Sequence, residues 1–123
     1  MRTGTLCTAP GATLPFEIGQ QLSANGLTTI ADMSSGSSGG ANEIQALQKL
    51  ANDERFPLRL SATVMVDVLP QMERPIPWDG KFQATSCKLL MDASLAGGTL
   101  ATLKPQLNDS TGNLNYTPES YQA

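Results

Sequence analysis

The residues of this chain that could do chemistry gather in one stretch, CKLLMDASLAGGT, which runs from Cys87 to Thr99. Lys88 stands inside an apolar run that is typical of a buried strand, and this run ends in Asp92. A buried ammonium group is costly unless it is paired or chemically altered. Lys88 is therefore either less buried than the pattern indicates or present for its chemistry.

Two aspartates, Asp92 and Asp32, stand where predicted strands end. Side chains alternate along a strand, so Lys88 and Asp92 would share one face of a strand over residues 84–92, with Asp92 at its carboxyl end. Open α/β sheets and (β/α)₈ barrels place their chemistry at that end. Asp32 ends an earlier strand in the same way, just before a Ser/Gly-rich loop. Asp92 and Asp32 are therefore candidate residues for the rim of an active site.

Each of these residues also has a purely structural interpretation. Lys88 could lie on an edge strand with its ammonium group in water, and Asp92 could simply begin a loop. Trp78, which lies between a proline and Asp79, is expected to anchor a loop rather than to stack on a ligand. Cys87 is expected to be a small hydrophobic core residue.

The loop MSSGSSGGAN, residues 33–42, precedes a predicted helix and could bind a phosphate group through its backbone N–H groups. Its Ser/Gly composition also resembles a linker or an expression tag, but the loop is internal and flanked by structured patterns. For that reason we interpret it as a natural loop. It contains neither G-x-G-x-x-G nor the P-loop pattern, which disfavours phosphate binding. Gly39 and Gly40 would be central to any phosphate site.

The composition excludes several kinds of site. The chain has no histidine, which removes the commonest metal ligand and general base, and with them any Ser-His-Asp or His-zinc site built from this chain alone. Its net charge is −3 and it has no basic stripe, so nucleic acid and anionic membranes are not expected as partners. Cys7 and Cys87 are expected to be reduced thiols in a soluble, cytoplasmic protein.

Periodicity and turn signals predict the secondary structure. Pro15 and Glu17 suit the first turn of a helix over residues 14–25, and Gly26 suits its end. A second helix is predicted to begin with Asn42 as its cap and Gln45 three positions on. We expect strands over residues 27–32, 58–66 and 84–92, a loop over residues 67–81, and an irregular tail in which a helix begins at residues 117–118.

This order of elements predicts one α/β domain over residues 1–123 with about three parallel strands. A strand–helix–strand segment implies a parallel pair with a right-handed crossover. One clear covering helix would leave part of the sheet and its edges exposed. The chain could therefore be a non-catalytic α/β module that forms homo-oligomers through its exposed sheet.

Three segments together resemble the amidohydrolase superfamily. They are GLTTIAD at residues 26–32, PLR at residues 57–59 and KLLMDAS at residues 88–94. In order and spacing they are similar to G-[IL]-T-T-[VI]-x-D, L-P-L-R and K-[LIF]-x-x-D-G-S of amidohydrolase family 3, the branch related to N-substituted formamide deformylases. Ala93 stands where that pattern usually has glycine. The resemblance covers roughly residues 14–121.

The resemblance implies a (β/α)₈ TIM barrel that binds divalent, zinc-like metal ions at its carboxyl end and hydrolyses C–N bonds other than peptide bonds in small-molecule amides. Lys88 aligns with the barrel lysine that can be carbamylated to bridge two metal ions. Reaction with CO₂ would convert a costly buried cation into a carboxylate-like anion that the metal ions stabilise. Lys88 is the one metal ligand that the resemblance implies for this chain.

The chain departs from the superfamily in important ways. The H-x-H motif, the histidines of later strands and the late-strand aspartate that acts as acid and base are absent. A complete (β/α)₈ barrel also needs about 200 residues or more. We therefore expect a barrel segment that belongs to a gene fragment or to a split protein, and that is inactive as an isolated chain.

Overall fold

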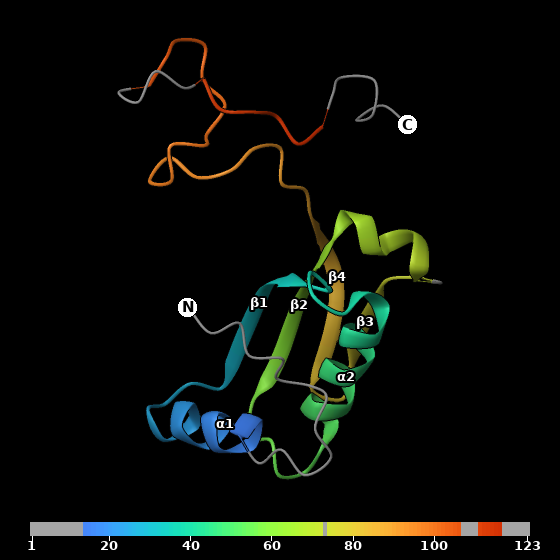
Figure 1. Ribbon diagram of the computed structural model, residues 1–123. Helices are drawn as coiled ribbons and strands as arrows, with labels where there is room; N and C mark the ends of the chain where they lie inside the picture. Colours follow the sequence, from blue (N-terminus) through green and yellow to red (C-terminus); the bar gives the residue numbers. More distant parts are fainter. Residues whose placement is uncertain (1–13, 73, 107–110, 117–123) are drawn as a thin grey trace. The chain divides into compact units, whose positions relative to one another are not determined.

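The computed structural model describes residues 14–72, 74–106 and 111–116 of the chain. Their regular elements form a four-stranded mixed sheet with helices around it (Figure 1). In chain order the elements are α1 (Leu14–Ala24), β1 (Thr29–Ser35), α2 (Gly40–Asn52), β2 (Arg59–Met65), the 3₁₀ helix η1 (Val66–Gln71), β3 (Ile76–Asp79) and β4 (Phe82–Lys88).

The sheet has the strand order β1-β2-β4-β3. β1 and β4 both pair in parallel with the central strand β2, which confirms the prediction of three parallel strands. β3 pairs antiparallel with β4 at the far edge. The chain is therefore a mixed α/β structure, and a short hairpin extends the parallel part of its sheet.

The loop predicted for residues 67–81 is wrong, because this segment contains η1 and β3. Its prolines led to the error. Pro70 lies inside a short 3₁₀ helix, and Pro77 lies in β3, an edge strand, where a missing N–H group is tolerated. Proline therefore did not exclude regular structure here.

The hydrophobic core lies between one face of the sheet and α2. The apolar spacing of Ile44, Leu47, Leu50 and Ala51 predicts one packed face of α2, and Ile44, Leu47 and Ala51 lie in or against this core, whereas Leu50 is not part of it. Full burial of a side chain such as Phe82 contributes about 1.5–3 kcal/mol. The buried hydrophobic residues of this core are Ile44, Ala51, Leu60, Ala62, Val64, Val68, Phe82 and Ala84.

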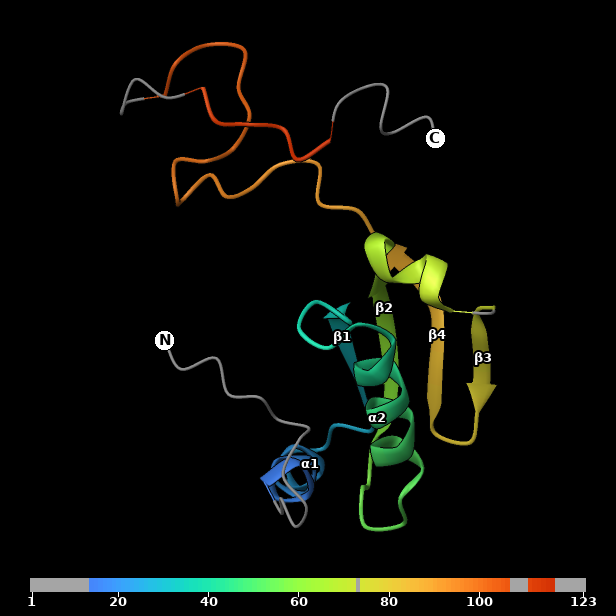
Figure 2. The ribbon, with the colours of Figure 1, turned by 45° about the vertical axis from the view of Figure 1, so that its right-hand side comes forward.

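α1 packs at the amino-terminal end of the sheet (Figure 2). Gly19 of α1 lies directly against the Phe56 ring, and a Cβ atom there would be only 2.7 Å from it. The guanidinium of Arg55 lies 4.2 Å from the centre of the Phe16 ring. Gly26, with φ of +88°, closes the helix in the left-handed conformation, as the sequence predicts.

The predicted start of α2 is wrong. The helix begins at Gly40, so Asn42 lies inside it and makes no capping hydrogen bond; Gln45 is likewise within the helix. Glu43 supplies the acceptor instead. Its carboxylate accepts the backbone N–H groups of Gly36, Ser38 and Gly39 at 3.0, 3.1 and 2.8 Å. One side chain from the first turn thus closes the loop that precedes its own helix.

Two strand ends also differ from the prediction. β4 ends at Lys88 rather than at Asp92, and β1 continues to Ser35 rather than ending at Asp32. Apolar residues beyond Lys88 extended the sequence pattern, but the described residues after Lys88 form no strand. Lys88 therefore occupies the strand-end position that the sequence assigned to Asp92.

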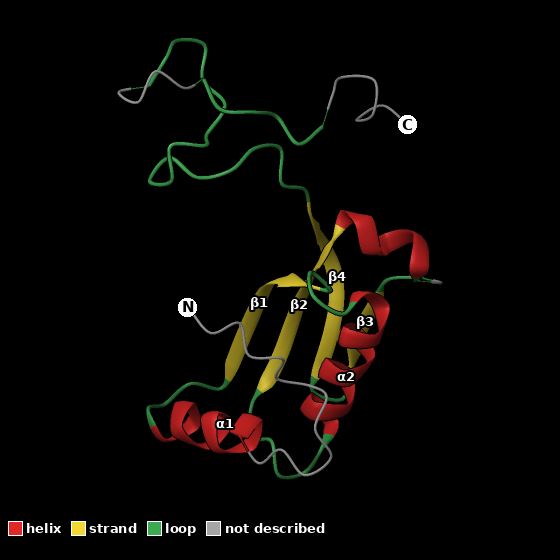
Figure 3. Ribbon diagram, in the orientation of Figure 1, coloured by secondary structure: helices red, strands yellow, loops and turns green. Residues whose placement is uncertain are grey.

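The chain divides into two compact units, and the boundary in the sequence lies between Lys88 and Leu89. The described residues of the second unit contain no helix or strand (Figure 3). Backbone hydrogen bonds such as that from Asn115 N–H to Met91 O, 2.7 Å, hold them. The prediction of a single domain over residues 1–123 stays a prediction. Cys7 and the helix start at residues 117–118 lie outside the described residues.

Candidate functional site

The face of the sheet opposite α2 carries polar side chains. Alternation along β2 buries Leu60, Ala62 and Val64 under α2 and turns Ser61 and Thr63 to the other face. Gln83 of β4 donates its Nε2–H to Ser61 Oγ at 2.9 Å. This second face, which we call the polar face, is therefore lined by hydrogen-bonded side chains rather than by an apolar core.

A β-bulge lies where β4 pairs with β2. Gln83 lies opposite Ser61, but Ser86 lies opposite Thr63, three residues further along β4 for two along β2. Thr63 Oγ1 and Ser86 Oγ are 3.0 Å apart, which shows that Ser86 reaches the polar face. Because alternation then continues, Lys88, two residues beyond Ser86, lies on the polar face as well.

A second bulge lies on the other side of β2. Asp32 of β1 lies opposite Ala62, and Ser35 lies opposite Val64, so β1 also gains one residue. The bulge in β1 lies at the carboxyl end of that strand, and the bulge in β4 lies between Gln83 and Ser86, near its middle. Such bulges are frequent at barrel rims and next to active sites, where they change the direction of a side chain.

A hydrogen bond from Lys88 of β4 links the two bulged strands across β2. Lys88 Nζ donates a hydrogen bond to Ser34 Oγ at 3.1 Å and is partly buried. Among the described residues the one ion pair joins Arg55 and Asp53 at the opposite end of the sheet, so no carboxylate neutralises Lys88 there. In the described part of the chain, the ammonium group of Lys88 is thus held by one neutral hydroxyl.

Asp32 has a different position from the one predicted. Its carboxylate accepts Ser34 N–H at 3.1 Å and Ser35 Oγ–H at 2.7 Å. Asp32 therefore satisfies the backbone of its own bulge. Ser35 is fully buried and Ser34 takes the place beside Lys88. Sequence reasoning missed Ser34, because nothing in MSSGSS distinguishes one serine from the next.

Asp92 belongs to the second unit. Its Oδ2 atom accepts Ala101 N–H at 3.3 Å, and its backbone carbonyl is 3.4 Å from Asn115 Nδ2. Within that unit Asp92 thus holds two loop segments together. Its assignment to a rim stays a prediction.

The Ser/Gly loop is not an open anion site. The three backbone N–H groups that could bind a phosphate already bind the Glu43 carboxylate. A phosphate would have to displace a tethered carboxylate from its donors. The geometry therefore disfavours phosphate binding through Gly39 and Gly40.

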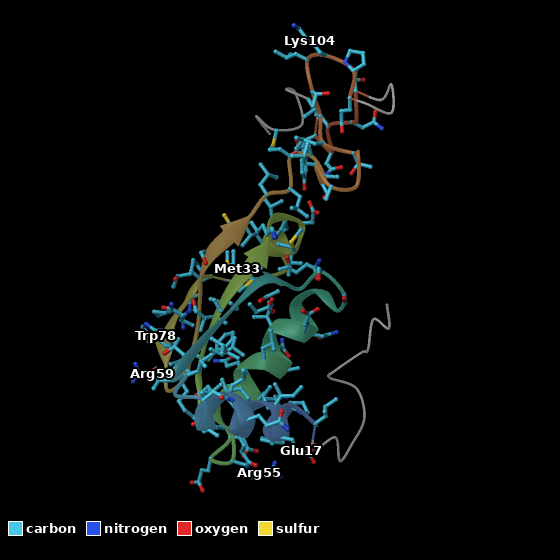
Figure 4. The ribbon with its side chains drawn as sticks, turned by 90° about the vertical axis from the view of Figure 1, so that its left-hand side faces the viewer. Glu17, Met33, Arg55, Arg59, Trp78 and Lys104 are labelled. Atoms are coloured by element: carbon cyan, nitrogen blue, oxygen red, sulfur yellow. The ribbon has the colours of Figure 1, made fainter. Side chains whose placement is uncertain are left out.

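Two other sequence predictions are wrong. Cys87 is exposed rather than a core residue, although the bulge in β4 places it opposite the buried Val64, near the carboxyl end of the strand. Trp78 is not a loop anchor: it lies in β3 and is 49% exposed. Figure 4 shows Trp78 and Arg59 on the side of the sheet away from α2. No helix among the described residues is long and apolar enough to cross a membrane.

Comparison with known protein families matches residues 18–122 to the amidohydrolase family. The chain belongs to the amidohydrolase family. The match covers all strands of the sheet and reaches into the second unit. No curated protein and no solved structure matched the chain.

The amidohydrolase family is generally metal-dependent, so the residues near Lys88 must be compared with a metal centre. Among residues 14–72, 74–106 and 111–116, no three His, Cys, Asp or Glu side chains lie close enough together to bind a metal ion. Ser34 Oγ and Lys88 Nζ are the polar groups at the meeting point of β1 and β4. These two groups do not form a metal centre by themselves.

Proposed function

We propose that this amidohydrolase-family chain supplies adjacent parallel strands of a metal-dependent (β/α)₈ barrel, and that Lys88 is its contribution to the metal centre. The observation that carries the proposal is the position of Lys88. It lies at the carboxyl end of a parallel strand, on the face opposite the covering helix, without a carboxylate partner among the described residues. In a closed barrel the helix-free face points inward and the carboxyl ends form the active-site mouth.

The arrangement of α2 supports the barrel interpretation. β1, α2 and β2 form a parallel β–α–β unit in which α2 covers one face only. On the opposite face Ser61, Thr63 and Gln83 present polar groups instead of a second apolar layer. A doubly wound sheet would need apolar residues on both faces, because helices cover both. In a (β/α)₈ barrel the helices cover one face of the sheet only, so one covered face fits a sector of a barrel better.

We propose further that the parent activity is hydrolysis of C–N bonds in small-molecule amides, as in the branch related to N-substituted formamide deformylases. The sequence segments at residues 26–32, 57–59 and 88–94 support this subgroup. The described residues offer one candidate metal ligand, Lys88, and the chain has no histidine. We therefore propose that the isolated chain is inactive. Because its net charge is −3, we also propose that nucleic acid and membranes are not among its partners.

The purified chain tests the proposal of inactivity. We expect no stoichiometric zinc after incubation with zinc and bicarbonate, and no release of formate from an N-substituted formamide. Lys88→Met is the matched control, and it should behave like the parent chain in both assays. Two zinc ions per chain that disappear in Lys88→Met would contradict the proposal, because they would show a complete centre in this chain alone.

Oligomerisation is the competing function. β1 is an unpaired edge strand, which favours association with another strand, but the polar face disfavours burial against a second apolar sheet. Light scattering coupled to size-exclusion chromatography separates the two cases. A tight homo-oligomer whose assembly is unaffected by Lys88→Met would favour the non-catalytic module.

A further inference from the structure

The structure assigns Ser34 as the residue that positions the Lys88 amine, and Asp32 as the residue that fixes Ser34. The inference rests on the proposed function in one respect: that function makes Lys88 a metal ligand, and so makes the position of its amine matter. It concerns a hydroxyl that is part of a featureless Ser/Gly run in the sequence. Three contacts carry it: Lys88 Nζ to Ser34 Oγ, Ser34 N–H to Asp32 Oδ1, and Ser35 Oγ–H to Asp32 Oδ2.

The bulge in β1 gives Ser34 its role. Without the extra residue, alternation from Met33 would turn Ser34 toward α2, because Thr63 Oγ1 donates to Met33 Sδ on the polar face. The bulge changes the direction of the backbone after Asp32. Ser34 Oγ then reaches an amine that is 54 residues away in sequence and comes from a strand on the other side of β2.

Asp32 keeps the bulge in this shape. Its two carboxylate oxygens accept one backbone N–H and one hydroxyl, at 3.1 and 2.7 Å. Hydrogen bonds to a carboxylate are about twice as strong as those between neutral groups. The Asp32 carboxylate thus holds Ser34 and Ser35 in fixed orientations, and the two serines point to different partners.

A flexible lysine side chain needs such an acceptor to be useful. The four-carbon stem of lysine has many rotamers, and fixing it costs conformational entropy. A hydrogen bond from Nζ to a rigid Ser34 selects the rotamers that keep the amine at the carboxyl ends of the strands. Ser34 therefore acts through Lys88 as a positioning residue rather than as a ligand or a nucleophile.

Nuclear magnetic resonance of the lysine ammonium groups in the ¹⁵N-labelled full chain tests this assignment. We expect the Lys88 ammonium protons to exchange with water more slowly than those of the exposed Lys49. In Ser34→Ala, exchange at Lys88 should become about three- to tenfold faster, which corresponds to the loss of one net hydrogen bond. Ser34→Thr, which keeps the hydroxyl, should restore slow exchange.

Two further variants separate positioning from folding. Ser34→Cys has similar size but a weak acceptor, so it should speed exchange at Lys88 while the melting temperature stays near that of the parent. Asp32→Asn weakens the clamp and should give a smaller increase in the same direction. Ser37→Ala, an exposed serine of the adjacent turn, should leave exchange at Lys88 unchanged.

Unchanged exchange at Lys88 in Ser34→Ala and Ser34→Cys, or no restoration in Ser34→Thr, would overturn the assignment. These readouts involve no metal, so they can fail while Lys88 remains the proposed ligand. Conversely, the ligand role can fail while Ser34 is still shown to hold the amine.

Discussion

The two ends of β4 each have a lysine, and the two lysines are held in different ways. Lys81 directly precedes the strand, and its ammonium group donates hydrogen bonds to the backbone carbonyls of Asp53, at 2.8 Å, and of Phe56. The backbone N–H of Lys81 donates to Asn52 Oδ1 at 2.8 Å. Among the described residues, Lys88, which ends the strand, is bonded to one hydroxyl. The first lysine fixes the loop between α2 and β2, whereas the second makes a single contact with a neutral side chain. The lysine at the amino end of β4 is therefore held more firmly than the lysine at its carboxyl end.

Replacing each lysine by methionine should separate the two roles most clearly. Lys81→Met leaves two carbonyls of the loop without their charged donor, so we expect a loss of about 2–3 kcal/mol in the free energy of unfolding. Lys88→Met removes a single hydrogen bond to a neutral group, and about 1 kcal/mol or less is expected. Urea denaturation of both variants measures the difference. Equal losses in the free energy of unfolding would show that the two lysines do not differ in their contribution to stability.

Gly19→Ala sharpens the description of the amino end. The new Cβ atom would lie 2.7 Å from the Phe56 ring, against the loop that Lys81 fixes. Overpacking of this kind costs about 1–3 kcal/mol, and thermal unfolding should show it. In Gly97→Ala the nearest atoms lie 3.5 Å away, so this control should unfold like the parent. Equal melting temperatures for the two variants would show that α1 does not pack tightly on this loop.

Glu43→Gln tests the loop at the carboxyl end. The neutral amide keeps the shape of the side chain but loses one carboxylate acceptor and its charge, so we expect a loss of about 1 kcal/mol. Amide hydrogen exchange should become faster at Gly36, Ser38 and Gly39, and Glu54→Gln, an exposed position, should change none of these. Unaltered exchange would show that the carboxylate does not hold the loop.

The smallest effect is expected from the exposed ion pair at the amino end. Hydrogen bonds from the side chain and backbone of Arg55 lower the pKa of Asp53 from 3.8 to about 2. A lowered folded-state pKa contributes stability above about pH 4, and this contribution is lost as the pH falls through about 2. The stability of the parent and of Asp53→Asn should therefore converge between pH 4 and pH 2 in urea titrations. A difference that grows on acidification would contradict the sign.

Parts of this structure follow directly from local patterns in the sequence. The apolar spacing of Ile44, Leu47, Leu50 and Ala51 predicted the packed face of α2, with Leu50 the exception, and the β-branched run before Asp32 predicted a strand. The left-handed Gly26 predicted the end of α1. These features depend on neighbours close in sequence, which periodicity and turn chemistry report well.

The features that build the candidate site depend on pairing between distant strands. No glycine or proline marks the bulges after Asp32 and after Gln83, so the sequence did not reveal them, and the apolar run beyond Lys88 extended the predicted strand to Asp92. Ser34 was missed because its role requires a lysine 54 residues away. Lys88 was singled out as a charge inside an apolar run, and its role as a metal ligand comes from the family resemblance and stays a prediction.

Metal content of a grafted barrel tests the central claim most directly. Residues 26–88 of this chain would replace the corresponding strands of an intact, metal-dependent amidohydrolase, with and without Lys88→Ala. We predict that the graft with Lys88 holds its full complement of metal ions in the presence of bicarbonate, and that the Lys88→Ala graft folds but loses at least one of them. Equal metal content in the two folded grafts would show that Lys88 is not a metal ligand.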